Sequence, residues 1–287
     1  MEHTAGPHAP APRDLTGPDW AADDVDARAY LRRLGVRPDA RTDRATLEAV
    51  HAAHVHAFPF SNVDVLLRRH PGIDPATVSR RMLEEDRGGL CYEHVQLMAA
   101  GLEALGFTVV RRLARVKTPW SGRTHAVLEV PLDGRRLLMD PGFGLSVTGP
   151  IELVDGAERP EPLGPYRVER RGKGPAAAWA LLRGDELLHL TDELPALPRD
   201  LRAAATVVST DPGAGPFLHG LVASRFTPEG HVTVTGAHRT VRRPGRATER
   251  EPLSPASAVA AVRELGVAVD DDAAAALEER LSSRPAR

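Results

Sequence analysis

The chain has 287 residues, 42% of them hydrophobic, which is enough for one large domain or for two to three small, closely packed ones. Its 37 basic and 39 acidic residues form no dense basic patch, and the longest apolar runs are too short to span a bilayer, so we expect neither a nucleic-acid nor a membrane partner. The single cysteine cannot form an internal disulfide and the N-terminus has no signal-peptide pattern, so we expect a cytoplasmic protein with a reduced thiol.

The first third of the chain is predicted to be mainly helical. Residues 1–18 are rich in Pro, Ala and His without periodicity and indicate a flexible tail. Four amphipathic helices then follow, with apolar ridges of helical period and, in most cases, an acidic cap or a closing glycine. They are predicted in DDVDARAYLRRLG, DRATLEAVHAAHVHAF, DPATVSRRMLEE and CYEHVQLMAAGLEALG. A short strand is predicted in NVDVLL, between the second and third helices.

After Gly106 the apolar period drops toward two, which is typical of strands. Turns rich in Gly, Pro and Asp separate the predicted strands FTVVRRLARV, HAVLEV, RRLLMD, YRVERR, AAWALL, ELLHL and HVTVTG. Helices return in SPASAVAAVRELG and DAAAALEERL. This order of helices, mostly antiparallel strands and a mixed C-terminal part predicts an α+β fold.

The only cysteine, Cys91, stands in RGGLCYEH, behind a Gly-Gly pair and at the predicted start of a helix. A thiol in the first helical turn faces unpaired N–H groups and the positive end of the helix dipole, which favour a thiolate. An unreactive core thiol is the alternative, because free cysteines are often buried. A nucleophilic role requires a base nearby and a group that orients the base.

A candidate base and its orienting group lie further along the chain. His125 begins HAVLEV, and Asp140 ends RRLLMD. If Asp133 and Gly134 form a two-residue hairpin loop, Asp140 is a diagonal neighbour of His125 on the same face, about 7–8 Å away at Cα. The hairpin therefore predicts a carboxylate–imidazole hydrogen bond that fixes the tautomer and raises the basicity of the ring. A strand-end histidine bonded to other surroundings is the alternative.

Three motifs resemble the signature of the arylamine N-acetyltransferase family, which includes the related macrolactam-forming amide synthases: RGGLCYEH, THAVLEV and LMDPGFG. Further similar segments occur in the family's order, in YLRRLG, HVHAFPFSNVDVLL, LEALGF and VSTDPGAGPF. The similarity extends from about Tyr30 to the final helix. It covers most of the chain.

The resemblance implies three domains and a triad. The domains are a helical one over residues 19–88, an antiparallel β-barrel over 89–200 with the cysteine helix at its start, and an α/β lid over 201–287. The implied catalytic residues are Cys91, His125 and Asp140. We expect three aromatic side chains to line the substrate pocket, with a core role as the alternative for each: Phe58, Phe60 and Phe143.

The reaction implied by the resemblance is a ping-pong acyl transfer. Cys91 takes an acyl group from a thioester such as acetyl-CoA, and an aromatic amine then collects it as an amide. His125 activates the thiol and Asp140 orients His125, while Arg87 and Glu93 support the start of the cysteine helix. Neither a cofactor beyond the thioester co-substrate nor a metal is expected.

Some positions depart from the family pattern, and they bear on which molecule donates the acyl group. These are Val95 in place of Asn, Ser61 in place of Glu, Pro141 in the variable slot of DPGFG, and Ala214-Gly215-Pro216 in place of the Ser before Phe217. The segments between Val116 and His125 and after Gly144 also lack a Gly-rich run that some members use near the CoA pyrophosphate. An acyl carrier protein that delivers a polyketide chain for macrolactam formation is therefore an alternative partner.

Other interpretations remain open. A cysteine hydrolase uses the same triad with water as acceptor, and a non-catalytic binding scaffold is the alternative of another class. The scaffold is disfavoured because all three triad residue types are kept. His51, His54 and His56 could suggest a metal site, but their spacing does not place all three on one helical face and no Cys or carboxylate cluster lies beside them. We therefore expect structural or surface roles for these histidines.

Overall fold

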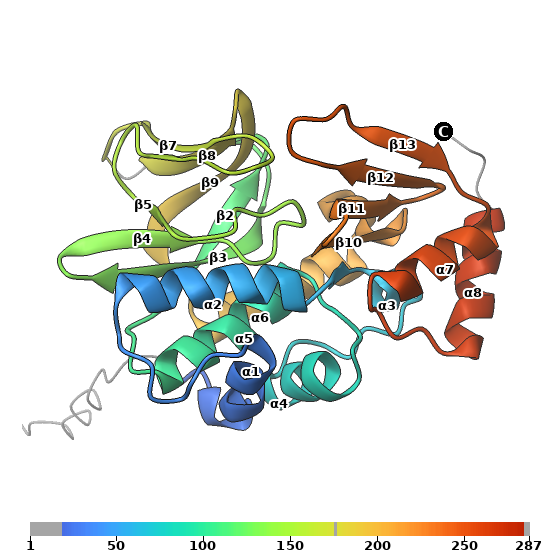
Figure 1. Ribbon diagram of the computed structural model, residues 1–287, viewed down its shortest axis with the longest axis horizontal. Helices are drawn as coiled ribbons and strands as arrows, with labels where there is room; N and C mark the ends of the chain where they lie inside the picture. The colour runs from blue at the N-terminus through green and yellow to red at the C-terminus, as the bar shows by residue number, and fades with distance from the viewer. Residues whose placement is uncertain (1–18, 175–176, 284–287) are drawn as a thin grey trace, which may run out of the picture.

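The N-terminal part of the chain is helical, as predicted. The computed structural model describes residues 19–174 and 177–283, so the predicted tail over residues 1–18 lies outside the described part (Figure 1). A short 3-10 turn, Ala22–Asp24, precedes the helices α1 (Ala27–Leu34), α2 (Arg44–Ala57), α3 (Val63–Leu66), α4 (Pro75–Ser79) and α5 (Cys91–Ala104). A π-helical turn, Arg80–Glu84, continues α4.

The starts of the first two helices are fixed by acidic caps. The Asp26 carboxylate accepts a hydrogen bond from the Ala29 N–H at 2.8 Å, and the Asp43 carboxylate accepts one from the Thr46 N–H at 2.9 Å. Such caps satisfy backbone donors that have no partner inside the helix. The predicted start of α1 and that of α2 are therefore confirmed, and α1 ends at the predicted Gly35.

Helix α5 lies at the centre of the main hydrophobic core. Its residues are buried continuously from Cys91 to Leu102. It contacts the helices α1, α2 and α4, and it also contacts strand β3 (Arg123–Leu132) of the sheet. A helix surrounded in this way has little freedom to move, so its first residue is held in a fixed place.

The middle of the chain forms an eight-stranded antiparallel sheet that curls into a nearly closed barrel (Figure 1). The order of its strands is β5-β4-β3-β2-β9-β8-β7-β6. Besides β3, they are β2 (Val110–Val116), β4 (Arg135–Met139), β5 (Ile151–Glu152), β6 (Glu158–Arg159), β7 (Tyr166–Arg171), β8 (Ala178–Arg183) and β9 (Glu186–Pro195). The barrel therefore places β3, β2 and β9 side by side.

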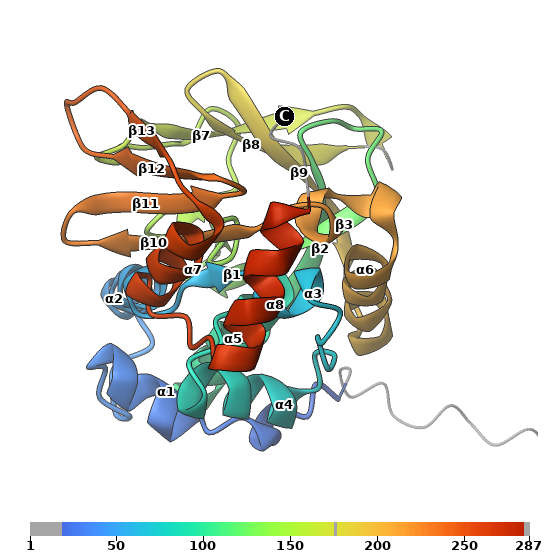
Figure 2. The ribbon, with the colours of Figure 1, turned by 90° about the vertical axis from the view of Figure 1, so that its right-hand side faces the viewer.

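A second antiparallel sheet forms the C-terminal part together with two helices. Its strands, in spatial order, are β1 (Phe60–Ser61), β10 (Val222–Thr227), β11 (Gly230–Thr235), β12 (His238–Arg242) and β13 (Glu249–Pro252). Helix α7 (Pro255–Glu264) contacts β11, β12 and helix α8 (Asp271–Ser282), and Figure 2 shows this arrangement from the side. Because β1 comes from the N-terminal part, this sheet is tied to the helices around α5.

The hairpin between β3 and β4 has the predicted register. Leu128 faces Met139 and Leu132 faces Arg135, so Asp133 and Gly134 form the loop. Both loop residues have positive φ, 49° and 73°, as a type I′ turn requires. The α+β class predicted from the element order is confirmed as well.

One predicted element is wrong, and one helix and six strands, β1, β5, β6, β10, β12 and β13, were not predicted. NVDVLL is not a strand: Val63–Leu66 form α3, and only the preceding Phe60–Ser61 pair with β10. Apolar runs this short do not distinguish a buried helical turn from a strand. Helix α6 (Pro198–Thr210) was also missed, although Pro198 in its first turn and Asp200, whose carboxylate accepts from the Leu197 N–H at 2.9 Å, mark its start.

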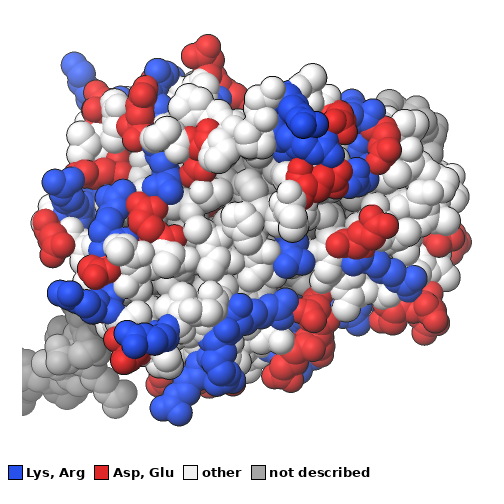
Figure 3. Space-filling view, viewed as in Figure 1, with Lys and Arg blue, Asp and Glu red and all other residues white. Residues whose placement is uncertain are grey.

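The surface carries both charge signs. Figure 3 shows basic and acidic side chains interspersed on one face, and ion pairs such as Arg44–Glu48, at 3.2 Å, join them. No helix within residues 19–174 and 177–283 is long and apolar enough to cross a membrane.

Candidate active site

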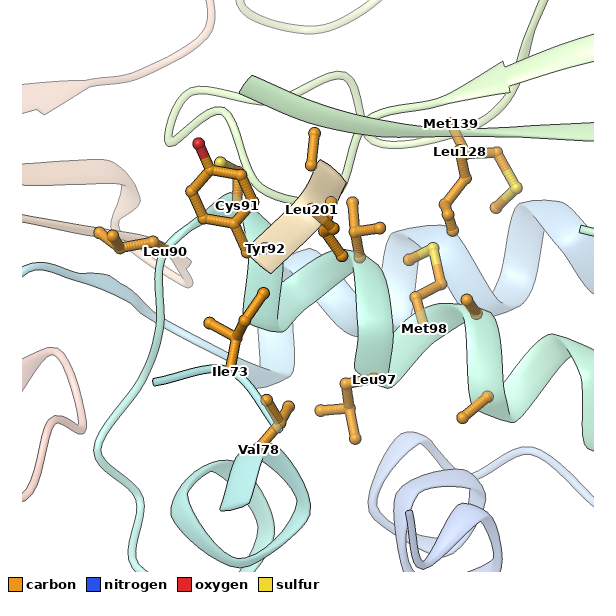
Figure 4. Packing of buried hydrophobic residues seen from close by; sticks show 14 of the residues in the cluster. Ile73, Val78, Leu90, Cys91, Tyr92, Leu97, Met98, Leu128, Met139 and Leu201 are labelled. Carbon is orange, nitrogen blue, oxygen red and sulfur yellow. The ribbon is translucent and has the colours of Figure 1, made fainter. Parts of the chain in front are cut away.

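Cys91 is the first residue of α5 and is 5% exposed. Its neighbour Glu93 is fully buried and accepts a hydrogen bond from the Leu90 N–H at 2.7 Å, which closes the start of the helix. Figure 4 shows Cys91 at the start of α5, beside the ring of Tyr92. The Tyr92 hydroxyl donates a hydrogen bond to the carbonyl of Thr124 at 2.6 Å. This bond ties the cysteine helix to the residue just before His125.

The segment before Cys91 is held against β1. The Ser61 N–H donates to the Gly89 carbonyl at 3.0 Å, and the Gly89 N–H donates to the Pro59 carbonyl at 3.3 Å. Gly88 has a φ of 64°, and a Cβ on it would lie 2.6 Å from the Pro59 carbonyl oxygen. Gly88 is therefore required by a close backbone crossing just before the thiol, and a Cβ at Gly89 would lie 2.8 Å from the Cβ of Glu93.

Glu93 and Arg87 do not pair with each other. The Glu93 carboxylate lies 3.3 Å from His70 Nε2 and 3.5 Å from Arg81 Nε. Arg87 instead lies 3.1 Å from the Asp270 carboxylate, next to α8. Glu93 thus fixes the helix start, while Arg87 connects this region to the C-terminal helices.

His125 and Asp140 meet as the hairpin predicts. His125 Nε2 lies 3.1 Å from Asp140 Oδ1, and both side chains are buried. Cys91 lies close enough to the ring of His125 to raise the pKa of the imidazole. The structure therefore brings Cys91, His125 and Asp140 into one connected group.

The electrostatics of this group favour a charged imidazole. Burial alone would lower the pKa of His125, but the charge of Asp140, the nearby Cys91 side chain and the hydrogen bond to Asp140 raise it to about 10. Burial alone would raise the pKa of Asp140, but the charge and hydrogen bond of His125, helped by His189, lower it. His125 and Asp140 therefore form a buried ion pair.

We expect this pair to make stability fall as pH rises. An unfolded chain binds the His125 proton only below about pH 6.5, whereas the folded chain keeps it up to about pH 10. Below this window both states are protonated and the stabilisation is fully present; within it, each rise in pH costs stability. Urea unfolding across the window should show the free-energy gap between the wild type and His125→Gln narrowing as pH rises. A constant gap would contradict the charged pair.

A second histidine, His189 on β9, lies on the other side of Asp140. Its Nε2 lies 3.3 Å from Asp140 Oδ2, and its Nδ1 lies 3.2 Å from the Thr191 hydroxyl. Sequence reasoning placed His189 in a strand but missed this contact, because it depends on β9 pairing with β2. The possible ligand atoms of His125, Asp140 and His189 lie within 4.8 Å of one another, close enough to bind one metal ion. No other group of three His, Cys, Asp or Glu side chains in the described part of the chain does so.

The three predicted pocket aromatics lie in different surroundings. Phe143 is edge-on to His125, with ring centroids 5.2 Å apart, and so contacts the buried pair. Phe60 stacks on His94, which is one turn after Cys91, and packs on Phe217. Phe58 is 2% exposed and stacks on Tyr30 in the helical core. The structure therefore brings Phe143 to His125, and it places Phe58 in the core.

The three histidines of α2 differ in how far they are buried. His51 and His54 are fully buried, and His56 is exposed. His54 lies between the Tyr30 hydroxyl at 2.9 Å and His94 Nδ1 at 2.8 Å. His54 thus joins α1, α2 and α5.

Gly142, in the loop after β4, lies directly on the backbone of Cys91. A Cβ at Gly142 would lie 2.6 Å from Cys91 Cα, a backbone atom that cannot rotate away. The Gly142 N–H also faces Asp140 Oδ1 at 3.3 Å. Gly142 of the DPGFG motif therefore has to be glycine, because it packs against the first residue of α5.

We expect Gly142→Ala to lower the free energy of unfolding by about 1–3 kcal/mol, because the added methyl group forces the loop away from α5. Urea unfolding is the measurement. Gly220→Ala is the matched control, since a Cβ at Gly220 meets no atom within 4 Å. Equal stability of the two variants would show that the loop can move without cost.

Comparison with known proteins finds relatives that cover most of this chain. A family model described as N-acetyltransferase matches residues 43–272. The arylamine N-acetyltransferase of Mycolicibacterium smegmatis is 35% identical over 275 residues, covering 90% of this chain and 98% of that protein. The solved arylamine N-acetyltransferase of Mycobacterium abscessus superposes with a TM-score of 0.85 at 30% identity, covering 92% of this chain and 98% of that one. The Mycobacterium marinum enzyme in complex with CoA gives a TM-score of 0.79 at 29% identity, covering 89% and 98%.

These matches identify the chain as an acyltransferase enzyme. It belongs to the arylamine N-acetyltransferase family, as the motifs around Cys91, His125 and Asp140 indicated. The similarity covers nearly the full length of these relatives and therefore both sheets and the helices that hold Cys91.

Proposed function

We propose that this enzyme acetylates aromatic amines by a ping-pong mechanism in which Cys91 carries the acyl group. The observation that supports the proposal best is the meeting of one thiol, one imidazole and one carboxylate, contributed by α5, β3 and the end of β4. These are the groups that a nucleophile, a base and an orienting residue require. We assign these three roles to Cys91, His125 and Asp140.

In the first half-reaction, the Cys91 thiolate attacks the thioester carbonyl. A bond forms between Sγ and the acyl carbon, the donor carbon–sulfur bond breaks, and the leaving thiolate takes the proton from the His125 imidazolium. The exchange replaces one thioester with another, so leaving-group basicity changes little. Acetylated Cys91 and neutral His125 remain.

In the second half-reaction, the nitrogen of an aromatic amine attacks the acyl carbon. Its proton passes to neutral His125, the bond to Sγ breaks, and the amide leaves. The Cys91 thiolate and the His125 imidazolium are thereby restored. Asp140 remains ionised throughout and holds the ring of His125 in one orientation.

We infer that the donor is acetyl-CoA, supported by the CoA complex of the similar Mycobacterium marinum enzyme. The test is intact-protein mass after mixing with acetyl-CoA, with longer acyl-CoAs and with an acyl-N-acetylcysteamine thioester, beside Cys91→Ala. An acetyl adduct from acetyl-CoA that a simple arylamine discharges is expected. Labelling only by the pantetheine-like thioester would instead assign an acyl carrier protein as donor. No adduct from any thioester would contradict the proposal.

We also propose that the chain divides into the units 19–88, 89–200 and 201–287. The helices before α5, the barrel strands and the C-terminal strands with α7 and α8 fall within these ranges, which supports the division, while α6 crosses the boundary between residues 200 and 201. We propose a cytoplasmic location on chemical grounds, because a reducing compartment keeps a catalytic thiol free.

A further inference from the structure

We propose that His189 is a positioning residue for the reaction: it holds the second carboxylate oxygen of Asp140 and so fixes the carboxylate that orients His125. This inference rests on the proposed function. It extends the triad to a fourth buried side chain, on a strand that none of the triad residues occupies.

The two oxygens of Asp140 have different surroundings. Oδ1 faces His125 Nε2 at 3.1 Å and the Gly142 N–H at 3.3 Å. Oδ2 and His189 Nε2 are buried, and neither has an aligned hydrogen-bond partner among the described residues, yet they lie 3.3 Å from each other. A buried carboxylate oxygen without a donor is costly, and catalytic hydrogen bonds are often long before substrate binds. His189 is thus the donor that Oδ2 faces.

Thr191 sets which nitrogen of His189 carries the proton. Its hydroxyl lies 3.2 Å from His189 Nδ1. When this hydroxyl donates to Nδ1, the single proton of a neutral ring must sit on Nε2, facing Asp140. Burial lowers the pKa of His189 and the charge of His125 adds to this effect; together they outweigh the hydrogen bond and charge of Asp140, so the ring stays neutral. His189 can therefore donate without adding a second positive charge to the pair.

The barrel holds this arrangement in register. Ala114 on the middle strand β2 faces His125 on β3 and Thr191 on β9. The rings of His125 and His189 are 5.2 Å apart at their centroids. Three adjacent strands thus place the histidines on either side of one carboxylate.

The central variant is His189→Leu, which removes the donor and keeps an apolar side chain in the space. We expect kcat for arylamine acetylation to fall by about 10- to 100-fold, the rate equivalent of one hydrogen bond to a charged group, with KM nearly unchanged. We also expect the pH profile of Cys91 alkylation by iodoacetamide to move to higher pH, because a loosened Asp140 stabilises the His125 imidazolium less. His189→Gln, which keeps a donor, should recover most of both losses.

Two further variants keep the test decisive if His189→Leu folds poorly. Thr191→Val should lower kcat in the wild type but have little effect in the His189→Gln background, because an amide donor needs no tautomer. Leu190→Ala is the control for packing, since Leu190 contributes to a separate hydrophobic cluster with Ala180 and Leu182. All assays include EDTA, so that a cation bridging His125, Asp140 and His189 does not contribute.

Wild-type kcat and an unmoved alkylation profile in both His189→Leu and Thr191→Val would overturn the inference. So would equal losses in His189→Leu and Leu190→Ala without a shift of the profile, because the effect would then be one of packing alone. Failure of the proposed function is distinct: acetyl transfer would then persist in Cys91→Ala.

Discussion

Cys91→Ala is expected to reduce acetyl transfer by at least about 10⁴-fold while leaving the fold intact. The acyl group has no other thiol to occupy, because Cys91 is the only cysteine of the chain. The side chain is small and lies at the start of α5, so the free energy of unfolding should change by no more than about 1 kcal/mol. Steady-state kinetics and urea unfolding measure the two effects.

Cys91→Ser is the matched chemical control for this prediction. It keeps the shape of the side chain and a weakly acidic proton, but its hydroxyl does not ionise readily beside His125. We expect it to be nearly as inactive as Cys91→Ala. Transfer at close to the wild-type rate in Cys91→Ala would show that the donor passes its acyl group directly to the amine.

Asp140→Asn is expected to lower kcat by about 10⁴-fold. Asp140 contacts Nε2 of His125, which leaves Nδ1 as the ring nitrogen for Cys91. An amide group at position 140 can donate to Nε2, which places the ring proton on Nδ1, and the ring then cannot accept the proton of the thiol. The buried imidazolium also loses its counter-charge. Kinetics of acetylation, together with the rate of Cys91 alkylation, measure the effect.

Asp192→Asn is the control for loss of a carboxylate on the same barrel. The Asp192 carboxylate lies on β9 and pairs with Arg123 at 2.9 Å, and no contact joins it to His125 among the residues described. Its activity should stay close to that of the wild type. A loss of less than about tenfold in Asp140→Asn would limit Asp140 to a structural role.

The parts of the site that local sequence determines could be predicted. Asp133 and Gly134 specify a two-residue turn, the turn fixes the register of β3 and β4, and the register brings Asp140 to His125. The start of α5 could also be predicted locally, because the Gly-Gly pair precedes it and Glu93 accepts the hydrogen bond that caps it. In each case the determining residues lie within a few positions of the feature.

The parts that depend on distant pairing could not be predicted. His189 reaches Asp140 only because β9 pairs with β2, more than 70 residues earlier in the chain, and no local pattern encodes that pairing. Strand β1 likewise pairs with β10, although all the barrel strands lie between them in the sequence. Helix α6 is different, because Pro198 and Asp200 mark its start locally and sequence reasoning missed these signals.

The most direct test is to isolate the acetylated enzyme. The protein is mixed with acetyl-CoA, freed of donor by gel filtration, mapped by peptide mass spectrometry, and then mixed with an arylamine alone. We predict that the acetyl group sits on the peptide containing Cys91 and that the amine is converted to its amide in an amount equal to the acetylated enzyme. An isolated enzyme without the acetyl group, or one that passes none of it to the amine, would contradict the acyl-cysteine mechanism.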